Sequence, residues 1–182
     1  MRLAEADILI LPGRGNSGPD HWQRRWAGRI GTARVVEQEE WERPQLNDWT
    51  GRILDEIMMS TRPVVLIAHS LGVSAAVHAA QRIKDTKVKG ALLVAPPDHE
   101  GEAISPASKP FGPVPRDPLP FPSLLVASTN DPLCSVERAV DMATAWGSEI
   151  HFANDAGHIN AASGHGPWPE GLMMLTRLMQ RI

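Results

Sequence analysis

The sequence has almost no cysteine: its 182 residues include only Cys134. A single thiol cannot form a disulfide within the chain, and this usage is typical of a reducing compartment. The first residues combine two acids with a short apolar run, which is not the pattern of a signal peptide. We therefore expect a cytoplasmic protein.

A strong charge of one sign and a long apolar run are also missing. The formal net charge is −3 and the sequence shows no basic cluster, so nothing favours nucleic acid or an anionic membrane surface as a partner. No apolar run approaches the ~20 residues that span a bilayer. The length suits one globular domain, residues 1–182, with a sizeable core.

Short apolar runs alternate with amphipathic stretches along the chain. This alternation predicts an α/β fold with three layers, in which helices cover both faces of a mostly parallel, six-stranded sheet. The strands are expected at Asp7–Leu11, Ala33–Glu37, Pro63–Ala68, Val88–Val94, Ser123–Ser128 and Glu149–Ala153. The helices are expected at Asp20–Ile30, Leu46–Met59, Leu71–Ile83, Ser135–Trp146 and Pro169–Gln180.

Proline is concentrated in residues 96–122, which hold nine of the chain's 16 prolines. Proline removes backbone donors and blocks helices, so this segment is expected to be a long irregular loop. Because the loop follows a strand, it would lie at the carboxyl edge of the sheet. There we expect it to act as a lid or a pocket wall.

The most informative motif surrounds Ser70, in the sequence Ala68-His69-Ser70-Leu71-Gly72. It lies directly between a predicted strand and a predicted helix. A strand that reverses at once into a helix makes a tight, strained turn that exposes the serine hydroxyl. We therefore predict a nucleophile elbow, although a serine in this position could also simply cap the helix.

A serine nucleophile needs a general base and a carboxylate that orients the base. Hydrolases with this elbow supply them in the order serine, acid, histidine. Asp131 and His158 each lie a few residues past a predicted strand, so both should reach the sheet edge that carries Ser70. These three residues are the predicted catalytic triad, with Asp155 as the alternative acid and His165 as the alternative base.

The glycine loop at Gly13–Gly18 follows the first predicted strand and allows two interpretations. In a hydrolase, the backbone amides of Arg14 and Leu71 would form the oxyanion hole, and Gly13 would leave room for the substrate. In a dinucleotide-binding protein, the G-x-G-x-x-G spacing would hold pyrophosphate and Glu37 would bind a ribose. A proline and an aspartate directly after the loop argue against the second interpretation, because the site needs free amides and no negative charge there.

Tryptophan is plentiful, with six residues, whereas tyrosine is absent. Trp22 and Trp26 share one face of a predicted helix, so packing in the core is the default expectation. Trp22 also follows closely on the glycine loop. It is therefore a candidate for the wall of an acyl pocket.

Several segments together resemble a known family. They are Gly13–Gln23, the Ser70 elbow, Asn130-Asp131-Pro132 and Gly157-His158-Ile159-Asn160. These segments resemble the small serine hydrolases related to retinoblastoma-binding protein nine, including the bacterial YdeN-like members. The resemblance implies a compact α/β-hydrolase fold without the usual first two strands, and it carries the triad onto the three predicted residues. It also implies that the second strand lies outside the first, with the elbow strand on the first strand's other side.

One feature of that family's name has no counterpart in the sequence. The chain contains no Leu-x-Cys-x-Glu pattern, so a pocket-protein partner is not supported. The remaining features predict a serine hydrolase without metal or cofactor, acting on small acyl esters as a carboxylesterase through an acyl-enzyme. The alternatives are the dinucleotide-binding protein and a hydrolase fold kept as a binding module.

Overall fold

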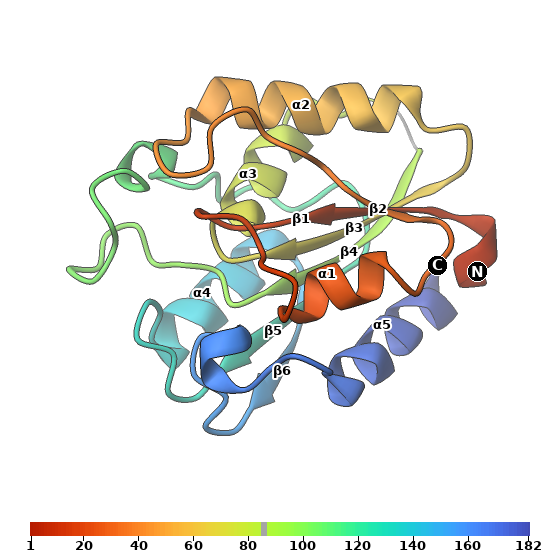
Figure 1. Cartoon of the computed structure of the whole chain (residues 1–182). Helices are drawn as coiled ribbons and strands as arrows, with labels where there is room; N and C mark the ends of the chain where they lie inside the picture. The colour runs from red at the N-terminus through yellow and green to blue at the C-terminus, as the bar shows by residue number, and fades with distance from the viewer. Residues whose placement is uncertain (85–86) are drawn as a thin grey trace.

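The computed structural model describes residues 1–84 and 87–182. Within them, six parallel strands form one sheet in the order β2-β1-β3-β4-β5-β6 (Figure 1). The strands are β1 (Asp7–Leu11), β2 (Ala33–Val35), β3 (Val64–His69), β4 (Val88–Val94), β5 (Ser123–Ser128) and β6 (Glu149–Ala153). The predicted α/β class is confirmed, and so is the order that the family resemblance implied, with β2 outside β1 and β3 on the other side.

Helices cover both faces of the sheet. They are α1 (Trp22–Ala27), α2 (Leu46–Met59), α3 (Leu71–Ala80), α4 (Val136–Trp146) and α5 (Pro169–Arg181). Figure 1 shows α2 and α3 on one side of the sheet, and α1 and α5 on the other. Apolar side chains of α4 join the core that α2 and α3 form, so the protein has three layers.

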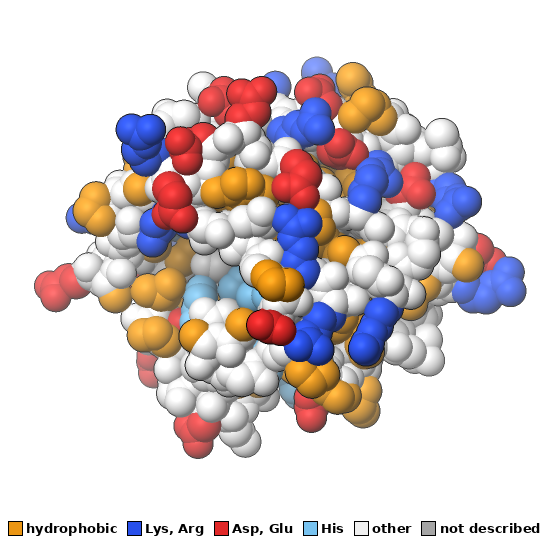
Figure 2. All heavy atoms as spheres, viewed as in Figure 1, with side chains coloured by type: hydrophobic (Ala, Val, Ile, Leu, Met, Phe, Trp, Pro, Cys, Tyr) orange, Lys and Arg blue, Asp and Glu red, His pale blue; other side chains and the backbone are white. Residues whose placement is uncertain are grey.

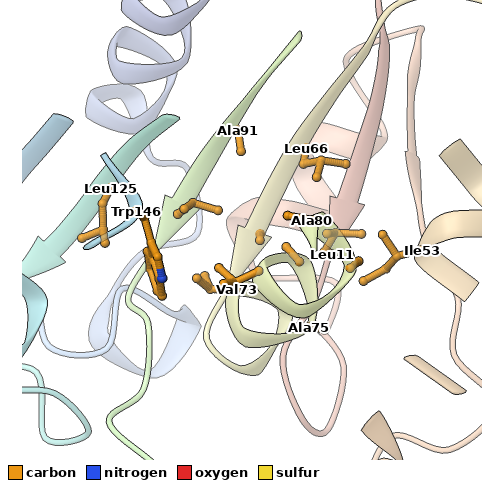
Figure 3. Packing of buried hydrophobic residues seen from close by; sticks show 14 of the residues in the cluster. Leu11, Ile53, Leu66, Val73, Ala75, Ala80, Ala91, Leu125 and Trp146 are labelled. Carbon is orange, nitrogen blue, oxygen red and sulfur yellow. The ribbon is translucent and has the colours of Figure 1, made fainter. Parts of the chain in front are cut away.

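The sheet is buried on both faces because its strands are apolar at successive positions rather than at alternate ones. All six residues of β3 are buried. Leu66 faces the core beneath α2 and α3, whereas Ile67 faces the core beneath α1 and α5. In Figure 3, alanine side chains of α3 lie close to Leu11 of β1 and Ile53 of α2. Each large aliphatic side chain buried in this way contributes about 1.5–3 kcal/mol, so the strand that leads to the predicted nucleophile is firmly fixed.

Three elements are shorter than the sequence predicts by two residues or more. Strand β2 ends at Val35 because its partner β1 ends before Pro12, which has no amide to continue the ladder. Helix α1 begins at Trp22 because His21 adopts an extended conformation and its ring caps the helix by accepting the backbone N–H of Gln23. Helix α3 ends at Ala80, after which the chain tightens into turns with hydrogen bonds of the 3-10 type.

The proline-rich segment 96–122 is irregular, as predicted, apart from a short 3-10 turn. Two histidines fasten it to α3. His99 Nε2 lies 2.7 Å from Ser74 Oγ, and His78 Nε2 lies 2.8 Å from the carbonyl oxygen of Phe111. The Phe111 side chain is also fully buried against α2 and α3. The loop is therefore held to α3 by two histidine contacts and by one buried aromatic ring.

A group of charged side chains ties the same loop to α4. Arg138 contacts Asp98 and Glu100 of the loop at 3.1 and 3.0 Å, and Arg116 of the loop makes two hydrogen bonds to Asp141. The loop therefore rests on two helices on the same face of the sheet. In the described residues, no helix is long and apolar enough to cross a membrane.

Candidate active site

Ser70 occupies a strained turn between β3 and α3. Its backbone has φ 54° and ψ −127°, a conformation that L residues avoid and that costs roughly 1–3 kcal/mol. A Cβ at position 72 would lie 2.3 Å from the carbonyl oxygen of Leu11, so only glycine fits there. The close approach of α3 to β1 therefore explains Gly72, and the turn has the geometry of a nucleophile elbow.

The three residues predicted as a triad form an unbroken chain of hydrogen bonds. His158 Nε2 lies 2.8 Å from Ser70 Oγ, and His158 Nδ1 lies 2.9 and 3.0 Å from the two carboxylate oxygens of Asp131. The Asp131 side chain is only 2% exposed. A carboxylate that faces Nδ1 fixes the proton on that nitrogen, so the free electron pair of Nε2 points at the serine hydroxyl.

The loops that carry Asp131 and His158 are bonded to each other at three successive positions. Three consecutive side chains directly before Asp131 accept hydrogen bonds from three consecutive backbone amides directly before His158. The bonds join Ser128 Oγ to Ala156 N (3.0 Å), Thr129 Oγ1 to Asp155 N (2.9 Å) and Asn130 Oδ1 to Gly157 N (2.7 Å). Residues that are far apart in sequence thus hold the acid and the base at a fixed separation.

Two further histidines lie behind the triad. His69 donates from Nε2 to the carbonyl oxygen of His158 at 2.9 Å, and its ring centre lies 5.0 Å from that of His158 and 4.9 Å from that of His21. Burial and the neighbouring imidazoles lower the pKa of His69 well below its ordinary value. The same causes lower the pKa of His21 to about 4. Both rings are therefore neutral near pH 7, and His69 supports the backbone of the predicted base.

Trp22 does not line the cavity, which corrects the expectation that it forms a pocket wall. Its side chain is fully buried, and its Nε1 donates to the carbonyl oxygen of Ile159 at 2.9 Å. The ring packs against Trp26 and Trp168. Trp22 therefore has the core role that its helical spacing predicts. It supports the site from beneath, through the backbone of Ile159 and through ring contacts with His21 and His69.

The predicted oxyanion groups lie beside Ser70. Gly13, Arg14 and Leu71 line the same cavity as the serine. A Cβ on Gly13 would lie 2.9 Å from the Cβ of Ser70, so the glycine is needed for this approach. In residues 1–84 and 87–182, the amides of Arg14 and Leu71 donate to no acceptor. Leu71 has a free N–H because it is the first residue of α3, whereas the Arg14 guanidinium turns outward to Glu42 at 2.9 Å.

The alternative acid and base lie elsewhere. Asp155 is exposed, and the carboxylate that meets His158 is that of Asp131. His165 contacts Ser163 and Trp168 rather than the serine nucleophile. The structure thus brings together the first choices and leaves both alternatives outside the site.

The glycine loop does not have the geometry of a dinucleotide site. It meets Ser70 instead of opening a helix, because α1 begins only at Trp22. Glu37, the residue expected on a ribose, is paired with Arg24 at 3.0 Å. Within the described chain, no group of three or more metal-ligating side chains could hold a metal ion.

A cavity of about 400 Å³ opens over the serine. Figure 2 shows histidine side chains at the bottom of a hollow on this face. One wall is apolar and comes mainly from the proline-rich loop: Pro97, Ala103, Ile104 and Leu133. Other lining residues are polar, among them Asn16, His21 and Asn160, and the loop itself adds Ser105 and Ser108. The cavity therefore offers both apolar and polar surface to a bound molecule.

Sequence reasoning missed the supporting residues. Asn130 was visible only as part of a family motif, although a polar run directly before a predicted acid is a usable signal for loop bonding. His69 and His21 gave no signal, because their contacts join segments that are separated by more than 40 residues in the sequence. Their placement depends on the assembled sheet edge.

A parallel α/β sheet in which a strained serine at a strand end meets a histidine and an aspartate defines the class of α/β hydrolases. The chain belongs to the serine hydrolase family, whose family model matches residues 8–177. Among curated proteins, no sequence matches this chain.

Two solved structures are similar to this chain over nearly its whole length. A protein described as a YdeN-like hydrolase from Pectobacterium atrosepticum is 36% identical, with a TM-score of 0.87 over 97% of this chain and 92% of that chain. The ydeN gene product of Bacillus subtilis is 18% identical, with a TM-score of 0.78 over 97% and 99%. The resemblance to YdeN-like hydrolases that the sequence suggested is confirmed by these relatives.

Proposed function

We propose that the protein is a carboxylesterase that hydrolyses small acyl esters through an acyl-enzyme on Ser70. One observation carries the proposal: the hydrogen-bonded chain from Ser70 through His158 to the buried carboxylate of Asp131. A serine hydroxyl by itself is a weak nucleophile, and such a chain makes it reactive. The family membership supports the same class of chemistry.

The first half of the reaction forms the acyl-enzyme. As Ser70 Oγ attacks the ester carbonyl, His158 Nε2 takes the hydroxyl proton, and Asp131 stabilises the resulting imidazolium. The negative charge that develops on the carbonyl oxygen is stabilised by the free amides of Arg14 and Leu71. His158 then returns the proton to the departing alcohol oxygen, and the carbonyl re-forms.

The second half releases the acid. Water replaces the alcohol beside His158, loses a proton to Nε2 and attacks the acyl-enzyme, after which the proton returns to Ser70 Oγ. Apart from the ester and the water, both halves use only groups of the protein itself. The reaction therefore consumes one ester and one water and yields one alcohol and one carboxylic acid.

The size of the cavity supports a small substrate. About 400 Å³ is at the small end of ligand pockets, and the apolar wall suits a short acyl chain. The proline-rich loop that forms this wall is irregular and contributes no long apolar helix to shelter a fatty acyl chain. Both features support small esters over lipids.

A fluorophosphonate probe tests the proposal, because such a probe reacts only with an activated serine. We expect labelling at Ser70, complete loss of labelling in Ser70→Ala, and hydrolysis of p-nitrophenyl acetate or butyrate by the unchanged protein. Ser105→Ala, which removes another serine from the same cavity wall, is the matched control and should label normally. Labelling without ester turnover would instead favour another acyl substrate, and no labelling would favour a binding module.

A further inference from the structure

His21 lines the same cavity as Ser70 and has no part in the chemistry described above. Its Nδ1 accepts the backbone N–H of Gln23 at 3.2 Å and so caps α1. Its Nε2 has no acceptor in residues 1–84 and 87–182. This nitrogen is not sealed from solvent, and because His21 lines the cavity, a molecule bound there can accept a hydrogen bond from it.

The tautomer of His21 follows from its cap. Because Nδ1 accepts a hydrogen bond, the proton of the neutral ring must sit on Nε2. Burial, together with His158 and His165, lowers the pKa of His21 to about 4, so the ring stays neutral near pH 7. His21 is therefore a neutral, single N–H donor whose orientation is fixed by the helix it caps and by the edge of the His69 ring.

The position of His21 in the cavity indicates which part of an ester it meets. The alcohol oxygen must take its proton from His158, so the alcohol portion lies against the histidine side of the cavity. The ring of His69 touches both His158 and His21, with centres at 5.0 and 4.9 Å. His21 therefore lies one imidazole away from the proposed proton donor and lines the cavity together with Asn16 and Asn160.

We propose that His21 Nε2 donates a hydrogen bond to an oxygen in the alcohol portion of the substrate, which makes the enzyme selective for esters of oxygen-bearing alcohols, such as glycol or hydroxyalkyl esters, with a short apolar acyl group. This inference rests on the esterase function proposed above. It assigns the acyl chain to the loop wall and the oxygen-bearing alcohol to the wall with His21.

Three substitutions separate the donor from the helix cap. His21→Asn keeps a side-chain acceptor for the amide of Gln23, because asparagine is a favoured capping residue, but it removes the donor that reaches the cavity. His21→Ser does the same with a different side chain and serves if the asparagine variant folds poorly. His21→Gln is the matched control, because its amide nitrogen can reach the place of Nε2. Thermal unfolding of each variant checks that the fold is retained.

Two pairs of esters of equal shape provide the readout. Butyl acetate and 2-methoxyethyl acetate differ by an oxygen in the alcohol portion, and ethyl pentanoate and ethyl 3-methoxypropanoate differ by an oxygen in the acyl portion. For each protein the ratio of kcat/KM within a pair is measured, so intrinsic reactivity cancels between proteins. A neutral hydrogen bond is worth about threefold to tenfold, and we expect His21→Asn to lower the alcohol-side ratio by that factor, His21→Gln to retain most of it, and the acyl-side ratio to stay constant.

Other outcomes overturn the inference. An alcohol-side ratio that is equal in the unchanged protein and in the cap-retaining variants shows that His21 makes no such bond. A loss confined to the acyl-side ratio places the donor on the acyl group and reverses the assignment of the walls. Hydrolysis of none of the four esters by the unchanged protein, together with no turnover of p-nitrophenyl esters, defeats the proposed function itself and the inference with it.

Discussion

Asn130 accepts a hydrogen bond from the backbone amide of Gly157 at 2.7 Å, which joins the residue directly before the proposed acid to the residue directly before the proposed base. The same side-chain oxygen also accepts the Ser128 hydroxyl at 2.9 Å. This amide side chain therefore helps to fix the separation of the two loops that carry the proposed acid and the proposed base. The bond from Gly157 N to Asn130 Oδ1 is the shortest of the three bonds that join the loops.

Replacing Asn130 by alanine should lower kcat about tenfold and leave KM almost unchanged. The loop of His158 loses its nearest fixed point, so the imidazole spends less time in line with Ser70. Thr129→Val is the matched control, because it removes the bond to Asp155, which is further from the base, and it should change kcat much less. Steady-state kinetics on a short p-nitrophenyl ester measures both. Equal effects of the two substitutions would contradict a specific role for Asn130.

Asp131→Asn should reduce kcat by about 10³- to 10⁴-fold, because an amide favours the wrong tautomer of His158. Asp155→Asn should stay within about twofold of the unchanged protein, since that side chain is exposed and does not meet the imidazole. The two variants have the same change of charge, so they control for each other. The opposite ranking would move the acid to Asp155.

The length of the acyl chain should limit turnover. In a series of p-nitrophenyl esters, kcat/KM should be highest for acyl chains of roughly two to six carbons and should fall beyond, because each further methylene gains about 0.8 kcal/mol only where apolar surface can bury it. The cavity of about 400 Å³ provides that surface for a short chain only. A continued rise up to dodecanoate would instead indicate a lipase.

Gly72→Ala should destabilise the fold by about 3 kcal/mol or more, because the new methyl group would lie 2.3 Å from a backbone oxygen of β1, and neither element can move freely. Gly51→Ala in α2 is the matched control. A Cβ there would meet nothing within 4 Å, so the substitution should stabilise the helix by about 0.5–1 kcal/mol. Urea unfolding of both variants gives the free energies. Equal stabilities would show that α3 can shift away from β1.

Stability should decrease as the pH falls from 7 to 5. Burial lowers the pKa of His21 from 6.5 to about 4 and holds the pKa of His69 well below its usual value. At pH values between about 4 and 6.5, the unfolded chain binds more protons than the folded one. The free energy of unfolding therefore decreases as the pH falls below about 6.5. His21 alone accounts for about 2 kcal/mol over this interval.

Urea unfolding at pH 7 and at pH 5 measures this dependence. In His21→Asn, which lacks the titrating ring, the decrease should be about 2 kcal/mol smaller than in the unchanged protein. A stability that is the same at both pH values would mean that neither histidine resists protonation in the folded state.

Much of the fold could be predicted because apolar strands, and their alternation with helices along the chain, are visible as local patterns in the sequence. Ser70, Asp131 and His158 were accessible for the same reason, since each follows a strand and all strands end at one edge. The start of α1 was not, because the ring of His21 caps the helix, which begins two residues after the predicted start at Asp20. Trp22 was ambiguous, since helical spacing and nearness to the glycine loop gave opposite expectations.

The contacts that support His158 could not be predicted from the sequence, for a physical reason. The bond from His69 to the backbone of His158 joins positions 89 residues apart. It exists only once β3 and the last loop have met at the sheet edge. No periodicity or local motif reports such a contact, because the carbonyl group that accepts it is common to every residue.

The fastening of the proline-rich loop to α3 through His78 and His99 bears on how substrates are recognised. The helix that starts at the nucleophile also carries one wall of the cavity, so the wall and the nucleophile move as one body. The conformational entropy of ordering that wall is lost once, when the chain folds, and not again at each encounter with a ligand. If the protein is the proposed esterase, its selection among substrates depends on complementarity to this preorganised shape and needs no closing motion of the wall.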